Sequence, residues 1–188
     1  MSLLELAPVK RPKRIPVAIS LAALAAAVLL ASCGGASDTT STETTAGSKK
    51  SVTVVPESGL LKAMKGVGYP VYWAGPRLGV AYEVQRQEGR TFVRYLPKGE
   101  EPGSEKTFLT VGSYEDRNAL AGVRESGQKP GAVLVKIDGG GTAYAESTDA
   151  TSAYMAFPGV DTQVEVFDPK AGEALRLIRS GAIVPVGS

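Results

Sequence analysis

The apolar positions beyond the first fifty residues fall into short runs with two different periods. Residues 80–86 and 91–96 alternate apolar and polar side chains, which is typical of strands with one buried face. Residues 87–90, which separate these runs, include Gly89, and glycine readily takes the positive φ that a tight turn requires. We therefore expect the two runs to form a β-hairpin.

A second hairpin is expected farther along the chain. Residues 132–137 and 142–146 flank the sequence Asp-Gly-Gly-Gly at 138–141. Asp-Gly between alternating apolar runs is a hairpin signal. The glycines lack both the Gly-x-x-x-x-Gly-Lys-Ser/Thr pattern and the strand-to-helix context of a phosphate-binding loop, so the pattern predicts a turn rather than a nucleotide site.

Two further segments have the period of a helix. Residues 57–65 place three apolar side chains on one side before Gly66, a common helix stop; they are Leu60, Leu61 and Met64. Residues 113–116 have the spacing of a capping box. The apolar stripe that follows them ends near Gly127 and consists of Ala119, Leu120 and Val123. We expect a helix at each of these places.

A third helix is predicted near the C-terminus. Asp168 can cap it, Pro169 suits its first position, and Ser180-Gly181 ends it. Its apolar face consists of Ala171, Leu175 and Ile178. Together these elements predict an α+β fold, a mainly antiparallel sheet with hairpins and about three short helices on one face.

The sequence also contains a weak sign of internal duplication. Residues 72–84 and 154–166 are identical at five of thirteen aligned positions. In addition, Ala119-Leu120 and Ala174-Leu175 each begin a segment that ends in Ser-Gly. A duplication would make each half of the domain strand, strand, helix and strand; chance identity is the alternative.

The beginning of the chain has the layout of an export signal. Residues 10–14 are basic apart from one proline, and residues 15–30 form a run of sixteen without any charge. A basic region followed by an apolar one is typical of a secretory signal. The run is shorter than the roughly 20 apolar residues of a membrane-spanning helix. We therefore expect residues 1–32 to be a signal peptide.

The end of this apolar run, Leu30-Ala31-Ser32-Cys33, resembles the lipobox of bacterial lipoproteins. The resemblance implies that Cys33 receives diacylglycerol through a thioether and that a signal peptidase cuts just before it. An uncleaved anchor or an ordinary signal peptide is the alternative. Two acyl chains anchor a protein stably, whereas one binds marginally. The expected location is the extracytoplasmic face of the cell membrane, with the membrane as a partner.

Residues 33–50 are predicted to be a tether, and residues 51–188 a single domain. The tether is rich in Ser, Thr and Gly and has no large apolar residue to order it. A coil of this length spans on the order of 20 to 25 Å. Without the first 32 residues, acidic and basic side chains nearly balance, so nothing predicts nucleic-acid binding.

The residue types present exclude several kinds of chemistry. The chain has no histidine, and Cys33 is its single cysteine. A disulfide within the domain, a Cys/His zinc site and a Ser-His-Asp or Cys-His catalytic arrangement are therefore impossible. We expect no metal and no cofactor. The acidic residues at 100, 101, 105, 115 and 116 are interpreted as solvated charges in loops and caps.

The candidate ligand-binding residues are Tyr72, Trp73 and Arg77, within the aromatic segment 69–77. Aromatic rings can stack on a ligand, and Arg77 could bind an anion. Equally, Tyr72 and Trp73 can be the apolar content of a core strand. We expect a membrane-anchored protein with a non-catalytic binding or interaction domain for an envelope protein or cell-wall ligand. The alternatives are a cell-wall hydrolase using Asp or Glu alone, and a passive subunit of an envelope complex.

Overall fold

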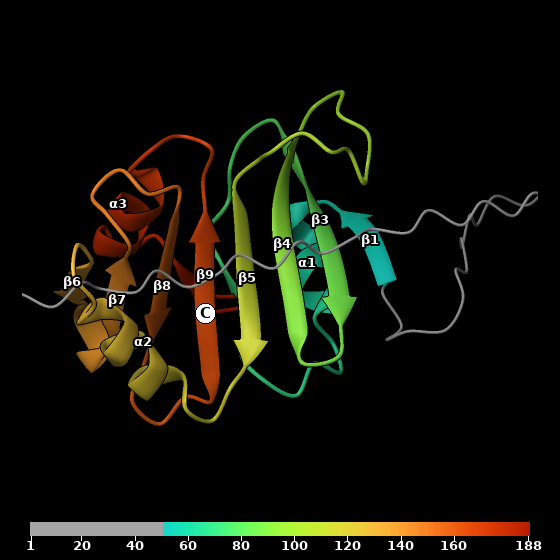
Figure 1. The fold of residues 1–188 in the computed structure, drawn as a ribbon. Coiled ribbons are helices and arrows are strands. Elements are labelled where there is room, and N and C mark those ends of the chain that lie inside the picture. The colour runs from blue at the N-terminus through green and yellow to red at the C-terminus, as the bar shows by residue number, and fades with distance from the viewer. Residues whose placement is uncertain (1–50) are drawn as a thin grey trace, which may run out of the picture. The chain divides into compact units, whose positions relative to one another are not determined.

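The computed structural model describes residues 51–188, which form an α+β domain that is mostly sheet (Figure 1). The main sheet has eight antiparallel strands in the order β1-β3-β4-β5-β9-β8-β7-β6. Its strands are β1 (Ser51–Val55), β3 (Val80–Gln87), β4 (Arg90–Pro97), β5 (Thr110–Glu115), β6 (Val133–Lys136), β7 (Thr142–Ala145), β8 (Ser152–Ala156) and β9 (Thr162–Phe167). The helices are α1 (Glu57–Ala63), α2 (Ala119–Gly127) and α3 (Glu173–Arg179).

Both predicted hairpins are confirmed. β3 pairs with β4 through a turn in which Gly89 has a φ of 64°. β6 pairs with β7, and the 3-10 turn η1 (Asp138–Gly140) lies between them, with Gly139 at a φ of 73°. A side chain with a Cβ is strained at such a φ, so glycine serves the turn at both places.

One face of the main sheet carries the larger core, and we call it the core face. It includes a row of directly paired apolar residues across five strands, namely Val84, Val93, Val111, Val166 and Ala153. All five are at most 2% exposed. Leu60 of α1 and four residues of α3 pack into the same cluster. Neighbouring pairs on one face are what stabilises a sheet, so this row is the centre of the fold.

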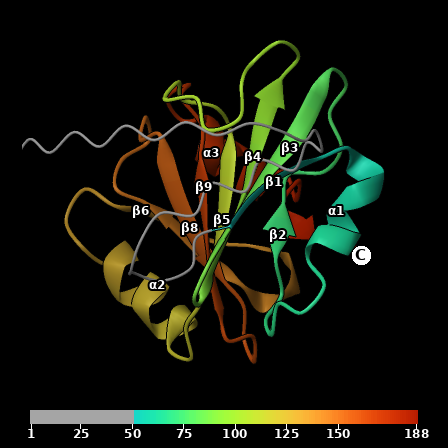
Figure 2. The same cartoon turned by 90° about the vertical axis from the view of Figure 1, so that its right-hand side faces the viewer.

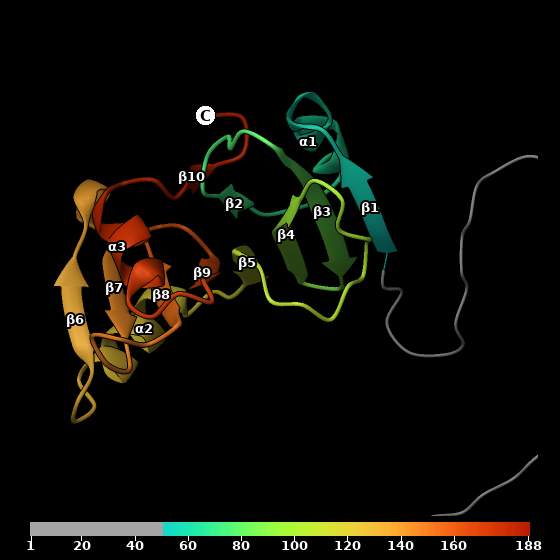
Figure 3. The same ribbon diagram turned by 90° about the horizontal axis from the view of Figure 1, so that it is seen from above.

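The other face of the sheet, which we call the opposite face, is only partly covered. Ala119 and Val123 of α2 pack there with Ala156, against Tyr144 and Tyr154. Figures 1 and 3 show α2 on one side of the sheet, with α1 and α3 on the other. The prediction that the helices share one face was therefore wrong. The apolar stripe of α2 packs into the second, smaller cluster on the opposite face.

The helices occur where the periodicity predicts them, but the residues that were expected to cap α2 and α3 do not cap them. Residues 113–115 continue β5, and α2 begins at Ala119, so the predicted capping box was wrong. Asp168 accepts a hydrogen bond from the N–H of Lys170 at 2.8 Å instead of capping α3, which begins at Glu173. Leu175 and Ile178 are buried, as predicted. Ala171, also assigned to that face, is exposed.

The predicted apolar side of the first helix is only partly correct. Leu60 is 1% exposed and reaches the core, whereas Leu61 is 64% exposed and Met64 is partly buried. The helix is only seven residues long, so one narrow stripe is enough to attach it. Leu61 instead lies beside Gly187, near the end of the chain.

A small second sheet pairs β2 (Tyr72–Trp73) with β10 (Val184–Pro185) beside the core face, as Figures 2 and 3 show. The N–H of Tyr72 donates to the hydroxyl of Ser113 on β5 at 2.9 Å, which ties this sheet to the main one. The aligned segments 72–84 and 154–166 begin in different sheets, and α2 and α3 lie on opposite faces. An internal duplication is thus not shown within residues 51–188.

The predicted signal peptide, Cys33 and tether lie outside the described residues. Their assignment remains a prediction from the sequence. In the part of the chain that the structure describes, no helix is long and apolar enough to cross a membrane.

Candidate functional site

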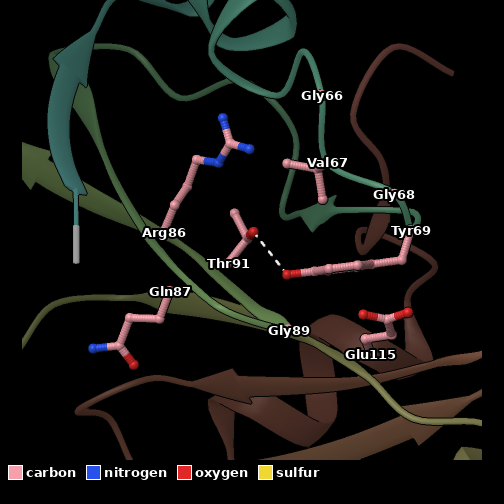
Figure 4. Close-up of a pocket in the computed structure, with 9 residues that line it drawn as sticks. All are labelled: Gly66, Val67, Gly68, Tyr69, Arg86, Gln87, Gly89, Thr91 and Glu115. Atoms are coloured by element: carbon pink, nitrogen blue, oxygen red, sulfur yellow. Dashed lines mark hydrogen bonds between the residues drawn. The ribbon is translucent and has the colours of Figure 1, made fainter. Parts of the chain in front are cut away.

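A polar pocket of about 220 Å³ lies between the loop after α1 and the ends of three strands (Figure 4). The loop contributes residues 66–69, and the rest of the wall comes from β3, β4, β5 and the turn between β3 and β4. The complete lining consists of Gly66, Val67, Gly68, Tyr69, Arg86, Gln87, Gly89, Thr91 and Glu115. The pocket therefore joins segments that are far apart in the sequence.

A hydrogen bond between Tyr69 and Thr91 lies inside this pocket. Their hydroxyl oxygens are 3.0 Å apart, and Thr91 is buried while Tyr69 is partly buried. Burial raises the pKa of Tyr69 above its usual value, although the hydrogen bond to Thr91 acts in the other direction. The phenol is therefore uncharged near neutral pH, and the pair offers neutral hydroxyl groups to a ligand.

Arg86 and Glu115 carry opposite charges at two sides of the pocket. Figure 4 shows the Tyr69–Thr91 hydrogen bond between them. Residues 51–188 contain three ion pairs, and neither Arg86 nor Glu115 belongs to any of them. Arg86 donates to the carbonyl oxygen of Lys65 at 3.3 Å, and Glu115 is exposed. Both charged groups thus retain free hydrogen-bonding capacity at the pocket.

The backbone around the pocket depends on two glycines. Gly66 follows α1 with a φ of 81°, and Gly89 forms the β3–β4 turn with a φ of 64°. Both values lie in the left-handed region that residues with a Cβ rarely adopt. These glycines bring the loop and the hairpin end close to Arg86 and Tyr69.

The pocket's chemistry suits binding of a small molecule that carries both charges. Arg86 can donate two parallel hydrogen bonds to a carboxylate, and Glu115 can accept from an ammonium group. The lining contains one carboxylate, whereas glycoside hydrolysis by carboxylates uses two that face the scissile bond. Within residues 51–188 no three Asp, Glu, His or Cys side chains lie close enough together to hold a metal ion.

The predicted ligand-binding residues differ in their burial and in the aromatic rings that they contact. Tyr72 is 5% exposed and stacks on Phe157, with ring centres 6.0 Å apart and planes 8° apart. Trp73 is partly buried, and its ring meets that of Tyr82 edge-on at 5.6 Å. Arg77 is exposed, 5.4 Å from the ring centre of Tyr95. Tyr72 is therefore a core residue, as the alternative interpretation held, and ligand binding by Trp73 and Arg77 remains a prediction.

Sequence reasoning missed most of the pocket. Tyr69 belongs to the aromatic segment 69–77, so that segment does reach the pocket at its first residue. Glu115 was interpreted as a solvated charge and is indeed exposed, but it lies at the pocket. No sequence pattern marked Arg86 as a pocket residue. An arginine at the end of a strand can be recognised as one only when the structure places the loop after α1 beside it.

Comparison of the chain with protein-family models, with curated proteins and with solved structures found no match.

Proposed function

We propose that this chain is a lipid-anchored protein of the extracytoplasmic membrane face, and that its domain binds a small ligand rather than catalysing a reaction. The order of basic region, apolar run and lipobox-like junction supports the anchor on Cys33. The Ser/Thr/Gly tether supports display of the domain at a distance from the bilayer.

The observation that carries the binding role is the pair of unpaired opposite charges in one pocket. Arg86 and Glu115 flank a hydroxyl pair and make no ion pair within the described residues. A ligand with one carboxylate and one ammonium group would satisfy both charges at once. We therefore propose a small zwitterion, such as a free amino acid or the end of a short peptide, as the ligand class.

The size of the pocket agrees with this ligand class. The pocket has a volume of about 220 Å³. An amino acid of modest size fits such a space, whereas drug-sized ligands occupy pockets of about 300 to 1,000 Å³. Larger envelope molecules would place only a terminal group there.

The alternative of a carboxylate-only hydrolase is less well supported. Such an enzyme needs an acid and a second carboxylate around the same bond. The pocket offers Glu115 together with a cation, Arg86, and this combination suits recognition of opposite charges.

The proposal is tested by isothermal titration of the full chain, in a nonionic detergent, with glycine, alanine, glutamate and the dipeptide alanylalanine. We expect saturable binding of at least one of them. Arg86→Gln and Glu115→Gln should each weaken it about tenfold, because a hydrogen bond to a charged group contributes about 1.5 to 3 kcal/mol. Arg179→Gln and Glu146→Gln are matched controls, since both residues are exposed and lie outside the pocket.

Two outcomes would contradict the pocket assignment. One is the absence of saturable heat with every zwitterion tested. The other is binding that Arg86→Gln and Glu115→Gln leave unchanged relative to the two control variants.

A further inference from the structure

The opposite face of the sheet carries a second group of polar and aromatic side chains, centred on Glu165. One row of paired residues crosses five strands there: Phe92, Gly112, Glu165, Tyr154 and Tyr144. Side chains that pair directly across strands lie on the same face. On this one face, the row therefore places one carboxylate between aromatic residues of the strands on either side of β9. Glu165 remains partly exposed.

Three hydroxyl groups hold the Glu165 carboxylate. Tyr114 donates to Oε2 at 2.7 Å, while Ser152 and Tyr154 donate to Oε1, each at 3.2 Å. Burial, together with the hydrogen bond to Glu165, raises the pKa of Tyr114 far above its usual value. Burial and the charge of Glu165 likewise raise the pKa of Tyr154 to about 12. The phenols thus keep their protons and act as donors, which fixes the orientation of the carboxylate.

No cation within residues 51–188 pairs with Glu165. The three ion pairs there involve Glu83, Glu100 and Glu173. Arg94, on the same face, is bound to Glu83. Arg90 lies opposite Tyr114, is exposed, and lowers the pKa of Tyr114 by its charge, but it is not within ion-pair distance of Glu165. The carboxylate therefore has oriented neutral donors and, among residues 51–188, no cation within ion-pair distance.

Aromatic rings stand on both sides of this carboxylate. Phe92 and Tyr114 meet edge to face, with ring centres 5.6 Å apart and planes at 88°. Tyr144 and Tyr154 stack, with centres 5.0 Å apart and planes at 18°. Ring faces are electron-rich and attract cations. Because α2 packs against Tyr144 and Tyr154, the features that favour a positively charged group are the charge of Glu165 and the Phe92–Tyr114 ring pair.

Gly112 makes this arrangement possible. It lies between Phe92 and Glu165 in the row. A Cβ there would come within 3.0 Å of the Tyr114 ring and 3.2 Å of the Phe92 ring. Because glycine has no side chain, both rings can lean over its backbone toward the carboxylate. A larger residue would push Tyr114 away from the position in which it donates to Glu165.

We propose that the cluster of Glu165, Tyr114, Tyr154, Tyr144 and Phe92 binds an organic ammonium group. The carboxylate supplies the charge, the hydroxyls hold it in place, and the rings contact the carbon atoms next to the nitrogen. A hard metal ion suits the cluster less well, since Ca²⁺ takes six to eight oxygen ligands and one carboxylate supplies two. This site lies on the opposite face, apart from the pocket of Arg86 and Glu115, so either can fail without the other.

The test follows the tyrosine ring signals in NMR spectra of the full chain, in a nonionic detergent, during titration with n-butylammonium chloride. Sodium chloride at equal concentration is the reference. We expect saturable shifts at Tyr114 and Tyr154, and at least tenfold weaker binding in Glu165→Gln, which keeps the shape and removes the charge. Glu173→Gln, on α3, is the matched control. Binding should weaken as ionic strength rises.

A second variant keeps the proposal testable if Glu165→Gln does not fold. Tyr114→Phe preserves the ring and the carboxylate but removes one donor, so we expect binding to weaken several-fold. A parallel titration with a lysine tripeptide shows whether the ammonium group belongs to a protein side chain or to a small amine. Tighter binding of the tripeptide than of butylammonium favours a protein side chain. Equal binding of the two favours a small amine. Unsaturable shifts, or shifts that persist in Glu165→Gln, would overturn the proposal.

Discussion

A buried ion pair fastens the loop after β4 to the opposite face of the sheet. Glu83 is fully buried, and its Oε2 accepts from Arg94 at 3.5 Å and from the N–H of Gly103 at 2.8 Å. Arg94 also donates to the carbonyl oxygens of Ser104 and Lys106. We predict that Arg94→Met strongly destabilises the domain, because it leaves Glu83 buried without a cation.

The expected loss follows from the burial of this pair. Removing one partner of a buried ion pair costs about 3 to 5 kcal/mol, out of a total stability of about 5 to 15 kcal/mol for a domain. Glu83→Gln should cost less, because Arg94 retains its carbonyl partners and is 12% exposed. The double variant should be more stable than the sum of the single effects predicts, by about 1 to 3 kcal/mol.

The assay is urea unfolding of the full chain, followed by circular dichroism. With a slope of about 2 kcal/mol per molar urea, a loss of about 4 kcal/mol lowers the midpoint by about 2 M. Lys106→Met is the matched control in the same loop. It removes an ion pair with Glu100 in which the lysine is 68% exposed, so we expect a change below about 1 kcal/mol. An Arg94→Met midpoint within the range of that control would show that the pair of Glu83 and Arg94 contributes little to the stability of the domain.

Three further predictions concern the stability of the same domain. Burial raises the pKa of Glu83, but the hydrogen bonds from Gly103 and the other donors outweigh burial and hold the pKa below its usual value. The contribution of Glu83 to the free energy of unfolding is therefore complete above about pH 4.3 and is lost at lower pH. Acid unfolding of Glu83→Gln should lack this loss of stability. Leu175→Ala should cost about 2 to 5 kcal/mol, and an unchanged melting midpoint would show that its burial is unimportant. Gly122 has open space around it, so Gly122→Ala should stabilise α2 by up to about 1 kcal/mol. A Cβ at Gly127 would meet Leu134, so Gly127→Ala should not stabilise the helix. Equal melting midpoints for these two variants would contradict the packing of α2.

The local elements of this fold could be predicted because their signals are local. A turn that needs positive φ selects glycine, and Gly89 and Gly139 mark both hairpins in the sequence. Leu175 and Ile178 of α3 are buried, as their spacing predicts, whereas Ala171 lies before the helix and is exposed. Starting signals were less dependable: Ser113 and Asp116 have the spacing of a capping box, yet pairing of β5 with β4 and β9 keeps Ser113 in a strand.

The two candidate sites could not be predicted, because they depend on strand order. β5 lies beside β9 although about fifty residues separate them, and only this pairing brings Tyr114 to Glu165. In the same way, only the folded chain brings the loop after α1 beside Arg86, which donates to the carbonyl oxygen of Lys65. Glu83 looks like an ordinary polar position of an alternating strand, but it is buried and accepts a hydrogen bond from Gly103 of the loop after β4.

The proposed envelope role depends on lipid attachment at Cys33, which metabolic labelling can detect. Bacteria that express the full chain are grown with a radiolabelled fatty acid, and the protein is recovered and its label measured. We expect labelling of the unaltered chain and none in Cys33→Ala at equal expression. Labelling that persists in Cys33→Ala, or an unlabelled parent chain, would contradict it.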